Sequence, residues 1–196
     1  ENQQLKNQVS DYRRTIIAYE ERFKEFDRLK TLKELQDSLV IPNVRAKVIG
    51  GAAMQWYSSR ILDQGSDAGV AKDNAAINAE GVVGRIVQVS RNTSVLQLIT
   101  DFDSGVGVLL ENSRAQGVLK GEGNRQAYVE YIGSNEKVVV GEKVLTSGLD
   151  QIYPKGLLVG YVIGSSATKQ LFQKIDVNVS ANVLKLEEVL ILKRES

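Results

Sequence analysis

The chain has 196 residues, of which 42% are apolar and 25% are charged, with 25 basic residues against 24 acidic ones. This length allows one or two domains with hydrophobic cores, and the balanced charge argues against a general nucleic-acid-binding protein, which needs an excess of Lys and Arg. Because the sequence has no cysteine and no histidine, it excludes disulfides, thiol catalysis, zinc ribbons, iron–sulfur ligation and histidine-dependent triads, and we expect neither a cofactor nor a metal.

The first 39 residues differ in composition from the rest of the chain. They hold sixteen charged residues, eight of each sign, whereas all 17 glycines and both prolines come after residue 41. Pro42 disfavours helix at the residue before it, so the sequence predicts a helix over residues 1–41 and a domain boundary where that helix ends. No apolar run reaches the roughly 18 residues of a membrane-spanning helix, and the polar start without Met suggests a trimmed N-terminus.

Apolar residues in this first segment recur at alternating spacings of four and three, which predicts a coiled-coil seam. The seam residues are Leu5, Val9, Tyr12, Ile16, Tyr19, Phe23 and Phe26. In a parallel dimer Arg22 and Asp27 would flank the seam as an interchain ion pair, which contributes less than about 1 kcal/mol when exposed. Two alternatives stay open. The seam joins two copies of the chain, or, since Tyr and Phe are less typical of a seam than Leu and Ile, it packs on the domain that follows.

From Val44 onward the sequence predicts short strands separated by turns, with no amphipathic helix between them. The predicted strands are 44–49, 81–89, 94–100, 106–110, 116–119, 127–132, 143–146, 157–163, 172–179 and 189–192. Alternation within 127–132 places Ala127, Val129 and Tyr131 on one face of that strand. The lack of intervening helices makes parallel βαβ units unexpected.

The predicted strands suit two small barrels or one sandwich, and we favour two barrels. The first barrel domain is expected over residues 42–113 and the second over residues 114–196, with the alternative that the last strands return to complete the first barrel. The expected fold class is therefore mainly β with one long N-terminal α-helix.

Two motifs offer candidate chemistry, and neither is specific. Asp101 and Asp103 begin a pattern like a calcium loop, but it lacks a third oxygen ligand before its glycine and has Asn112 in place of the distal Glu. Ser147 and Lys155 are the best candidates for a Ser–Lys dyad, since a desolvated lysine can act as a base. A hydroxyl beside a glycine is nevertheless ordinary in turns. The residues therefore favour a non-catalytic, self-associating interaction protein.

A series of motifs, in order along the chain, carries a resemblance to a known family. They are residues 46–49 followed by Trp56, then 62–70, 80–86, 94–101, 117–121, 141–148, 152–160 and 186–190. Together with the heptad helix, they resemble the bacterial rod shape-determining MreC family over essentially the whole chain. Residues 146–160 are the most specific part of the resemblance.

The resemblance implies a coiled coil followed by two six-stranded β-barrels, arranged somewhat like a chymotrypsin-type protease but without protease activity. It implies an N-terminal membrane helix that is absent from this chain, and a location on the periplasmic, extracytoplasmic face of the bacterial cytoplasmic membrane. It further implies a homodimer, capable of higher assembly, that acts with MreD, RodA, MreB and a class B penicillin-binding transpeptidase in cell elongation.

Three functions compete at this point. The leading expectation is a dimeric, non-catalytic scaffold that positions peptidoglycan synthesis enzymes to maintain rod shape, with edge strands of the barrels as docking sites. The second is a membrane-fusion or secretion adaptor, which usually needs a second helical arm that the sequence lacks. The third is a hydrolase that uses Ser147 or a pair of carboxylates.

Overall fold

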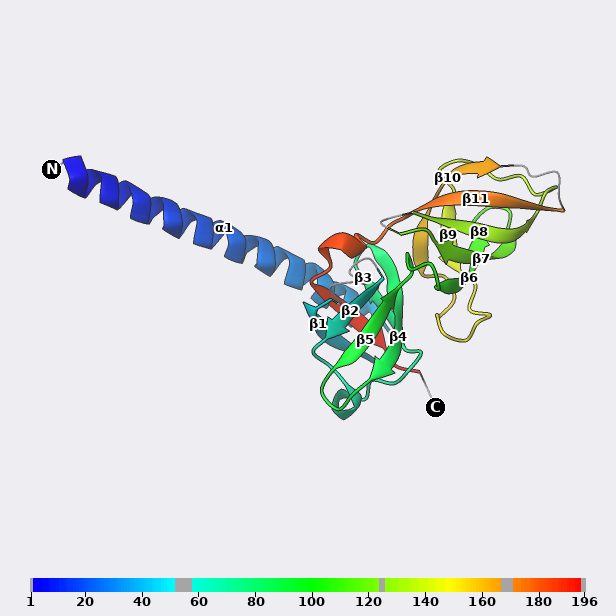
Figure 1. Ribbon diagram of the computed structural model, residues 1–196, viewed down its shortest axis with the longest axis horizontal. Coiled ribbons are helices and arrows are strands. Elements are labelled where there is room, and N and C mark those ends of the chain that lie inside the picture. The colour runs from blue at the N-terminus through cyan, green and yellow to red at the C-terminus, as the bar shows by residue number, and fades with distance from the viewer. Residues whose placement is uncertain (1, 52–57, 124–125, 167–170, 195–196) are drawn as a thin grey trace. The chain divides into compact units, whose positions relative to one another are not determined.

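The computed structural model describes residues 2–51, 58–123, 126–166 and 171–194, and within residues 2–8 and 10 it describes the backbone alone. Trp56, one of the motif residues, lies outside these ranges. The chain divides into two compact units, Glu1–Leu39 and Val40–Ser196 (Figure 1).

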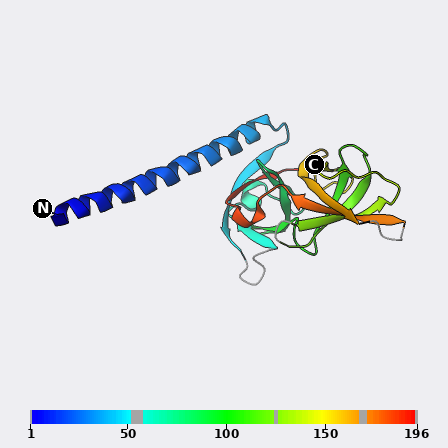
Figure 2. The same cartoon turned by 90° about the horizontal axis from the view of Figure 1, so that it is seen from above.

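The first unit is a single helix, α1 (Asn2–Ser38), which runs without interruption (Figure 2). Its 37 residues span about 55 Å at 1.5 Å per residue. The helix contains no glycine or proline, and the Ser38 hydroxyl donates to the carbonyl of Leu35 in the last turn (2.7 Å). The predicted helix is therefore confirmed, and it ends shortly before Pro42.

The second unit consists of two closed barrels whose strands all pair antiparallel. The first barrel has the strand order β1-β12-β3-β4-β5-β2 and the second has β10-β11-β8-β7-β6-β9. The strands of the first barrel are β1 (Asn43–Gly50), β2 (Ser59–Leu62), β3 (Ala75–Asn78), β4 (Gly81–Val89), β5 (Ser94–Leu98) and β12 (Glu188–Leu192). Those of the second are β6 (Gly105–Leu110), β7 (Gln116–Gly121), β8 (Gln126–Gly133), β9 (Lys143–Thr146), β10 (Leu158–Ser166) and β11 (Phe172–Val179). The expected fold class is confirmed.

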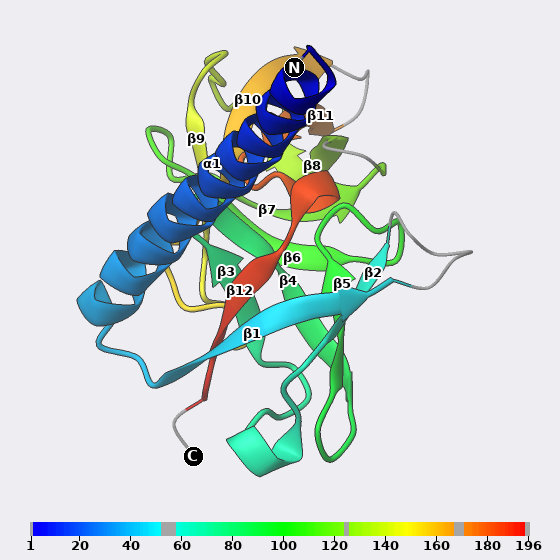
Figure 3. The same ribbon diagram turned by 90° about the vertical axis from the view of Figure 1, so that its left-hand side faces the viewer.

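The strand pairing divides the chain differently from the expected boundary after residue 113. Strand β6 pairs with β7 and β9 and so lies in the second barrel, although the sequence-based division placed it in the first. Strand β12 pairs with β1 and β3 and completes the first barrel, as Figure 3 shows. The second barrel is thus inserted between β5 and β12. The expected boundary differs because the partners of a strand are set by distant segments rather than by its own residues.

Two strands of the first barrel were not predicted. Strands β2 and β3 have four residues each, and the Ala-Ala-Ile-Asn sequence of β3 offers little alternation or β-branching. Two 3₁₀ turns, Ser66–Ala68 and Val183–Lys185, lie in the connections of the same barrel.

A bulge interrupts β8 where the sequence predicted plain alternation. Two residues of β8 lie opposite one residue of β11 at this point, and Tyr131 adopts a φ of 68°. Tyr131 is exposed and Ile132 is buried, whereas alternation predicted Tyr131 on the face of Ala127 and Val129. That prediction is wrong because a bulge inserts one residue and inverts the alternation beyond it.

Apolar side chains that alternate along the strands fill the barrels. Leu96 and Leu98 on β5 point inward in the first barrel, as do Ile175, Val177 and Val179 on β11 in the second. Each fully buried side chain of this size stabilises the fold by roughly 1.5–3 kcal/mol. These interiors account for the stability of the second unit without any disulfide.

Arg60 on β2 is a charged side chain buried inside the first barrel. Its guanidinium donates to the carbonyl of Val183 (3.0 Å) and to that of Ser59 (2.9 Å). Burial lowers the pKa of Arg60 from its ordinary value because the cation is removed from water. The bond to Val183 holds the turn before β12 against the barrel that β12 completes.

Candidate functional sites: an exposed helix face and the contact between the barrels

The predicted seam of α1 is a face of exposed apolar side chains. Val9, Tyr12, Ile16, Tyr19, Phe23 and Phe26 are 49–69% exposed to solvent. The seventh seam residue, Leu5, lies in α1, but its side chain is outside the part of the chain that the structure describes. Apolar side chains this exposed and this regularly spaced are typical of surfaces that another helix covers.

Charged residues occupy the other faces of α1. Glu21 and Lys24 form an ion pair at 2.8 Å, and Asp11 and Arg14 approach to 4.0 Å. In the heptad numbering these four residues take positions b, c and f, which lie away from the a and d positions of the seam. The hydrogen bond to Glu21 raises the pKa of Lys24. The helix is therefore amphipathic, with a seam bordered by solvated charge.

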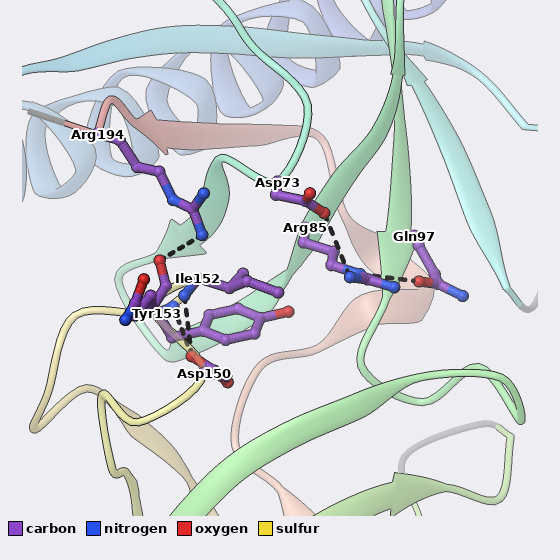
Figure 4. Close-up of polar contacts among 8 residues, drawn as sticks. Asp73, Arg85, Gln97, Asp150, Ile152, Tyr153 and Arg194 are labelled. Atoms are coloured by element: carbon purple, nitrogen blue, oxygen red, sulfur yellow. Dashed lines mark hydrogen bonds and ion pairs between the residues drawn. The ribbon is translucent and has the colours of Figure 1, made fainter. Parts of the chain in front are cut away.

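The loop between β9 and β10 packs against the first barrel through Tyr153. The Asp150 carboxylate shapes this loop by accepting hydrogen bonds from the backbone N–H groups of Ile152 (2.9 Å), Tyr153 (3.1 Å) and Gly107 (3.0 Å). Tyr153 is only 2% exposed, and its ring points toward Arg85 of β4 (Figure 4). The side chain thus connects the two barrels.

A polar network on the first barrel faces this tyrosine. Arg85 donates to Asp73 (3.2 Å) and to the side chain of Gln97 (3.3 Å), and Gln97 in turn donates to Asp101 (3.1 Å). Burial raises the pKa of the Tyr153 phenol, with the nearby Arg85 opposing the shift. The phenol is therefore neutral at physiological pH and acts as a packed contact rather than as an acid or base.

Glycines let the two backbones approach each other at two further points. A Cβ on Gly81 would lie 2.4 Å from the carbonyl oxygen of Leu158 in the second barrel, and the φ of Gly81 is 143°. A Cβ on Gly121 in the second barrel would lie 2.2 Å from the carbonyl carbon of Thr100. Only glycine fits at such contacts, so both positions fix the packing of one barrel on the other.

The two motifs with candidate chemistry serve as turns. The Ser147 hydroxyl accepts a hydrogen bond from the N–H of Leu149 (3.3 Å), and no hydrogen bond joins it to Lys155 in the described part of the chain. Asp101 accepts from the N–H of Asp103 (2.8 Å), which closes a turn after β5. Neither arrangement has the geometry of a nucleophile with its base, or of a calcium loop.

The described residues contain neither a cluster of metal ligands nor a membrane-spanning helix. No group of three or more Asp, Glu, His or Cys side chains lies close enough to hold a metal ion within residues 2–51, 58–123, 126–166 and 171–194. Over the described residues, α1 included, no helix combines the length and the apolar character needed to cross a bilayer.

The second barrel also exposes an aromatic pair. Tyr131 at the β8 bulge and Phe172 at the start of β11 pack edge to face, with ring centroids 5.9 Å apart. Both are exposed, and Leu171 beside them is among the most exposed apolar residues of the chain. A left-handed φ is rare for a bulky residue, so the bulge holds this aromatic group on the surface at some cost in backbone energy.

Sequence reasoning found the helix face but not the contact between the barrels. Residues 146–160 were recognised as the most specific part of the family resemblance, but without any indication of what this segment contacts. Nothing in the sequence linked Tyr153 to Arg85 and Asp73, because these residues are brought together only by the packing of the barrels.

Since each barrel is closed, neither offers an edge strand among its described strands, and the expectation of docking by strand addition is corrected.

Comparison with known proteins gives matches over most of the chain. The family model described as rod shape-determining protein MreC, barrel core, matches residues 48–193. The cell shape-determining protein MreC of Caulobacter vibrioides is 31% identical over 166 residues, which cover 83% of this chain and 47% of that protein. The chain thus spans about half the length of this relative.

Solved structures give the same fold. MreC of Listeria monocytogenes aligns with a TM-score of 0.75 and 25% identity, covering all of this chain and 97% of that one. A complex between penicillin-binding protein PBP2 and MreC from Helicobacter pylori contains a chain that aligns with a TM-score of 0.64 and 16% identity, covering 79% of this chain and 99% of that one.

Proposed function

Because this chain belongs to the MreC family of rod shape-determining proteins, we propose that it is a scaffold of the bacterial cell-elongation machinery. In this proposal two copies associate through α1, and the barrels bind and position an enzyme of peptidoglycan synthesis. The observation that carries the proposal is the exposed apolar seam of α1. The barrel strands direct most of their apolar side chains into the barrel interiors, whereas the seam leaves six described apolar side chains of one helix face in solvent.

A second copy of the chain is the occupant that best matches the seam. A heptad face of apolar side chains is complementary to an identical face, and Arg22 and Asp27 lie at the g and e positions, where a parallel partner would pair them. Each buried Ile or Phe contributes roughly 1.5–3 kcal/mol, while the exposed ion pair contributes less than about 1 kcal/mol. The apolar seam therefore supplies most of the association energy.

We propose a class B penicillin-binding transpeptidase as the enzyme partner. The Helicobacter pylori structure, with the same fold, is a complex with the penicillin-binding protein PBP2. The exposed pair Tyr131 and Phe172 is the surface that we propose for this contact, since closed barrels must bind through side chains. MreD, RodA and MreB remain predictions of the family resemblance.

The proposed location follows from the proposed partner. A transpeptidase that cross-links peptidoglycan works outside the cytoplasmic membrane, so a chain that positions it is placed on the extracytoplasmic side. We infer that the complete protein is anchored there by a membrane helix preceding α1. Binding would act by preferring one conformation of the transpeptidase over another, because a partner shifts an equilibrium only by its differential affinity.

The test of self-association uses two neighbouring isoleucines of equal chemistry. Ile16 lies on the seam and Ile17 lies beside it at position b, and both are well exposed. Sedimentation equilibrium over a concentration series is expected to show a dimer for the parent chain. The Ile16→Glu variant should weaken it tenfold or more, by roughly the energy of one buried side chain per helix.

Ile17→Glu is the matched control and should leave the dimer intact. Equal weakening by both variants, or a parent chain that stays monomeric at high concentration, contradicts dimerisation through this seam. The second result would favour the alternative that the seam packs on the domain that follows it. A chain that begins at Pro42 and still forms dimers would place self-association on the barrels.

A further inference from the structure

A groove runs beside the contact between the barrels, with a volume of about 630 Å³. One side is formed by residues that flank the strands of the first barrel, Ile41 before β1 and Leu192 to Arg194 at the end of β12. The other side is the loop between β9 and β10, including Leu149, Ile152 and Lys155. This volume is typical of pockets that bind a ligand or a few residues of a peptide.

The groove exposes apolar side chains. Val40 is 99% exposed and Leu149 is 67% exposed, although both line the groove. Ile41 and Ile152 are half-buried beside them. Such side chains, gathered around one hollow, provide apolar contacts for another chain.

Three basic residues line the same groove without an acidic partner. Lys155, Lys193 and Arg194 form no salt bridge with any residue in the described part of the chain. Elsewhere on the second unit, basic side chains such as Lys143 and Lys174 are paired with carboxylates, at 3.2 and 2.6 Å. The groove therefore carries positive charge that forms no ion pair with the described residues.

The guanidinium of Arg194 is held across the groove. It donates a short hydrogen bond to the carbonyl of Gln151 on the opposite side (Figure 4), while the N–H of the preceding residue, Lys193, donates to the carbonyl of Pro42 (2.7 Å). A guanidinium has five N–H donors in a planar fork, so one bond to a carbonyl leaves donors that match a carboxylate.

We propose that this groove binds an acidic, apolar segment of a partner protein. An Asp or Glu side chain of the segment pairs with Arg194, the ammonium group of Lys155 adds to the attraction, and flanking apolar side chains pack against Ile41 and Leu149. The side chain of Lys193 lies along Gly69, outside the groove, so Lys193 contributes its backbone rather than its ammonium group. The inference goes beyond the proposed function, because it assigns a second binding surface that depends neither on α1 nor on the Tyr131 and Phe172 pair.

A peptide suits this site better than a lipid. The exposed apolar side chains are separate and lie on two elements, as they would to receive successive side chains of an extended segment. The groove volume holds a few residues but not the acyl chains of a phospholipid. A lipid phosphate is therefore an outcome that the test must separate from peptide binding.

The test measures fluorescence anisotropy of a labelled heptapeptide, Gly-Leu-Glu-Leu-Asp-Leu-Gly with blocked ends, against the full chain at low ionic strength. A second peptide with Gln and Asn in place of the acids has the same shape without charge. The acidic peptide should bind more tightly by roughly tenfold, and added salt should reduce the difference.

Variants locate the binding on the chain. Arg194→Gln and Leu149→Asp should each weaken binding of the acidic peptide by about tenfold, whereas Lys137→Gln, which removes an exposed lysine outside the groove, should not change it. Thermal unfolding of each variant checks that the fold is intact. Equal binding of the two peptides, or an Arg194→Gln variant that binds as the parent does, overturns the proposal.

Vesicles containing phosphatidylglycerol provide the remaining arm of the test. If they bind the parent chain and lose binding with Arg194→Gln, while the acidic peptide does not bind, the groove is a phosphate site and the peptide proposal is wrong. No binding to vesicles together with selective peptide binding supports the proposal. Sedimentation equilibrium of Arg194→Gln and Leu149→Asp is expected to show the same dimer as the parent chain. A loss of peptide binding by these variants can then be distinguished from a loss of self-association.

Discussion

The helix and the barrels differ in how much of their apolar surface they bury. In the barrels, closure pairs the strands on both sides and directs residues such as Leu96 and Ile175 into an interior without solvent. In α1, backbone hydrogen bonds are satisfied within the helix, but apolar side chains such as Ile16 and Phe23 stay exposed. The apolar residues of the barrels are therefore covered by the barrels themselves, whereas the apolar face of the helix is left uncovered, as expected of the surface that we propose for self-association.

The largest effect on stability is expected when a side chain is removed from the interior of a barrel, in comparison with removal of one from the exposed seam of α1. Leu96→Ala removes a fully buried side chain and should lower the free energy of unfolding of the barrels by about 2–5 kcal/mol. Phe23→Ala removes a larger side chain from the exposed seam and should change it by less than about 0.5 kcal/mol. Urea unfolding followed by near-ultraviolet circular dichroism measures both. A similar loss in the two variants would mean that the seam belongs to the core of the barrels.

An intermediate effect is expected where the two barrels touch. Gly121→Ala places a methyl group within 2.2 Å of the backbone of Thr100, in the connection from β5 of the first barrel to β6, and should destabilise the second unit by about 1–3 kcal/mol. Gly133→Ala is the matched control, because its Cβ would come no closer than 3.9 Å to any neighbour, and it should have little effect. Thermal unfolding of both variants decides the matter. If Gly121→Ala is as stable as the control, the barrels are less tightly joined than the structure indicates.

The smallest effect concerns pH and the buried phenol that connects the two barrels. The pKa of Tyr153 is raised in the folded chain, so above about pH 10 the unfolded chain loses a phenol proton that the folded chain keeps. Stability should therefore fall as pH rises, by up to about 1.4 kcal/mol per pH unit from this group. Tyr153→Phe, which removes the buried phenol, should reduce the slope. Urea unfolding between pH 9 and 11 gives both slopes, and identical slopes for Tyr153→Phe and the parent would contradict the burial.

Local patterns in the sequence predicted most of the fold. The spacing of Val9, Ile16 and Phe23 predicted the helix face, and strands β4, β9 and β11 begin and end at the predicted residues. Strands β2 and β3 were missed because four residues carry too little periodicity to stand out. The bulge at Tyr131 was missed because nothing in an alternating pattern marks where an extra residue is inserted.

The candidate sites were predictable only where they lie on one continuous segment of the chain. The seam of α1 is a property of one continuous segment, so its residues could be read directly. The contact of Tyr153 with the first barrel joins segments about 70 residues apart, and the groove at Arg194 joins the two ends of the second unit to a loop between them. Such sites depend on which strands pair. The return of β12 to the first barrel was predicted only as an alternative, and the place of β6 in the second barrel was not predicted.

The return of β12 to the first barrel has a consequence for the order of events during synthesis. All strands of the second barrel lie between Gly105 and Val179, so this barrel can close as soon as that stretch has left the ribosome. The first barrel begins earlier in the chain but waits for Glu188–Leu192, whose pairing with β1 spans almost the whole unit. Contacts between segments so distant form slowly. The domain that starts first therefore finishes last, and a nascent chain that stops before Leu192 would expose the unfinished side of its own first barrel.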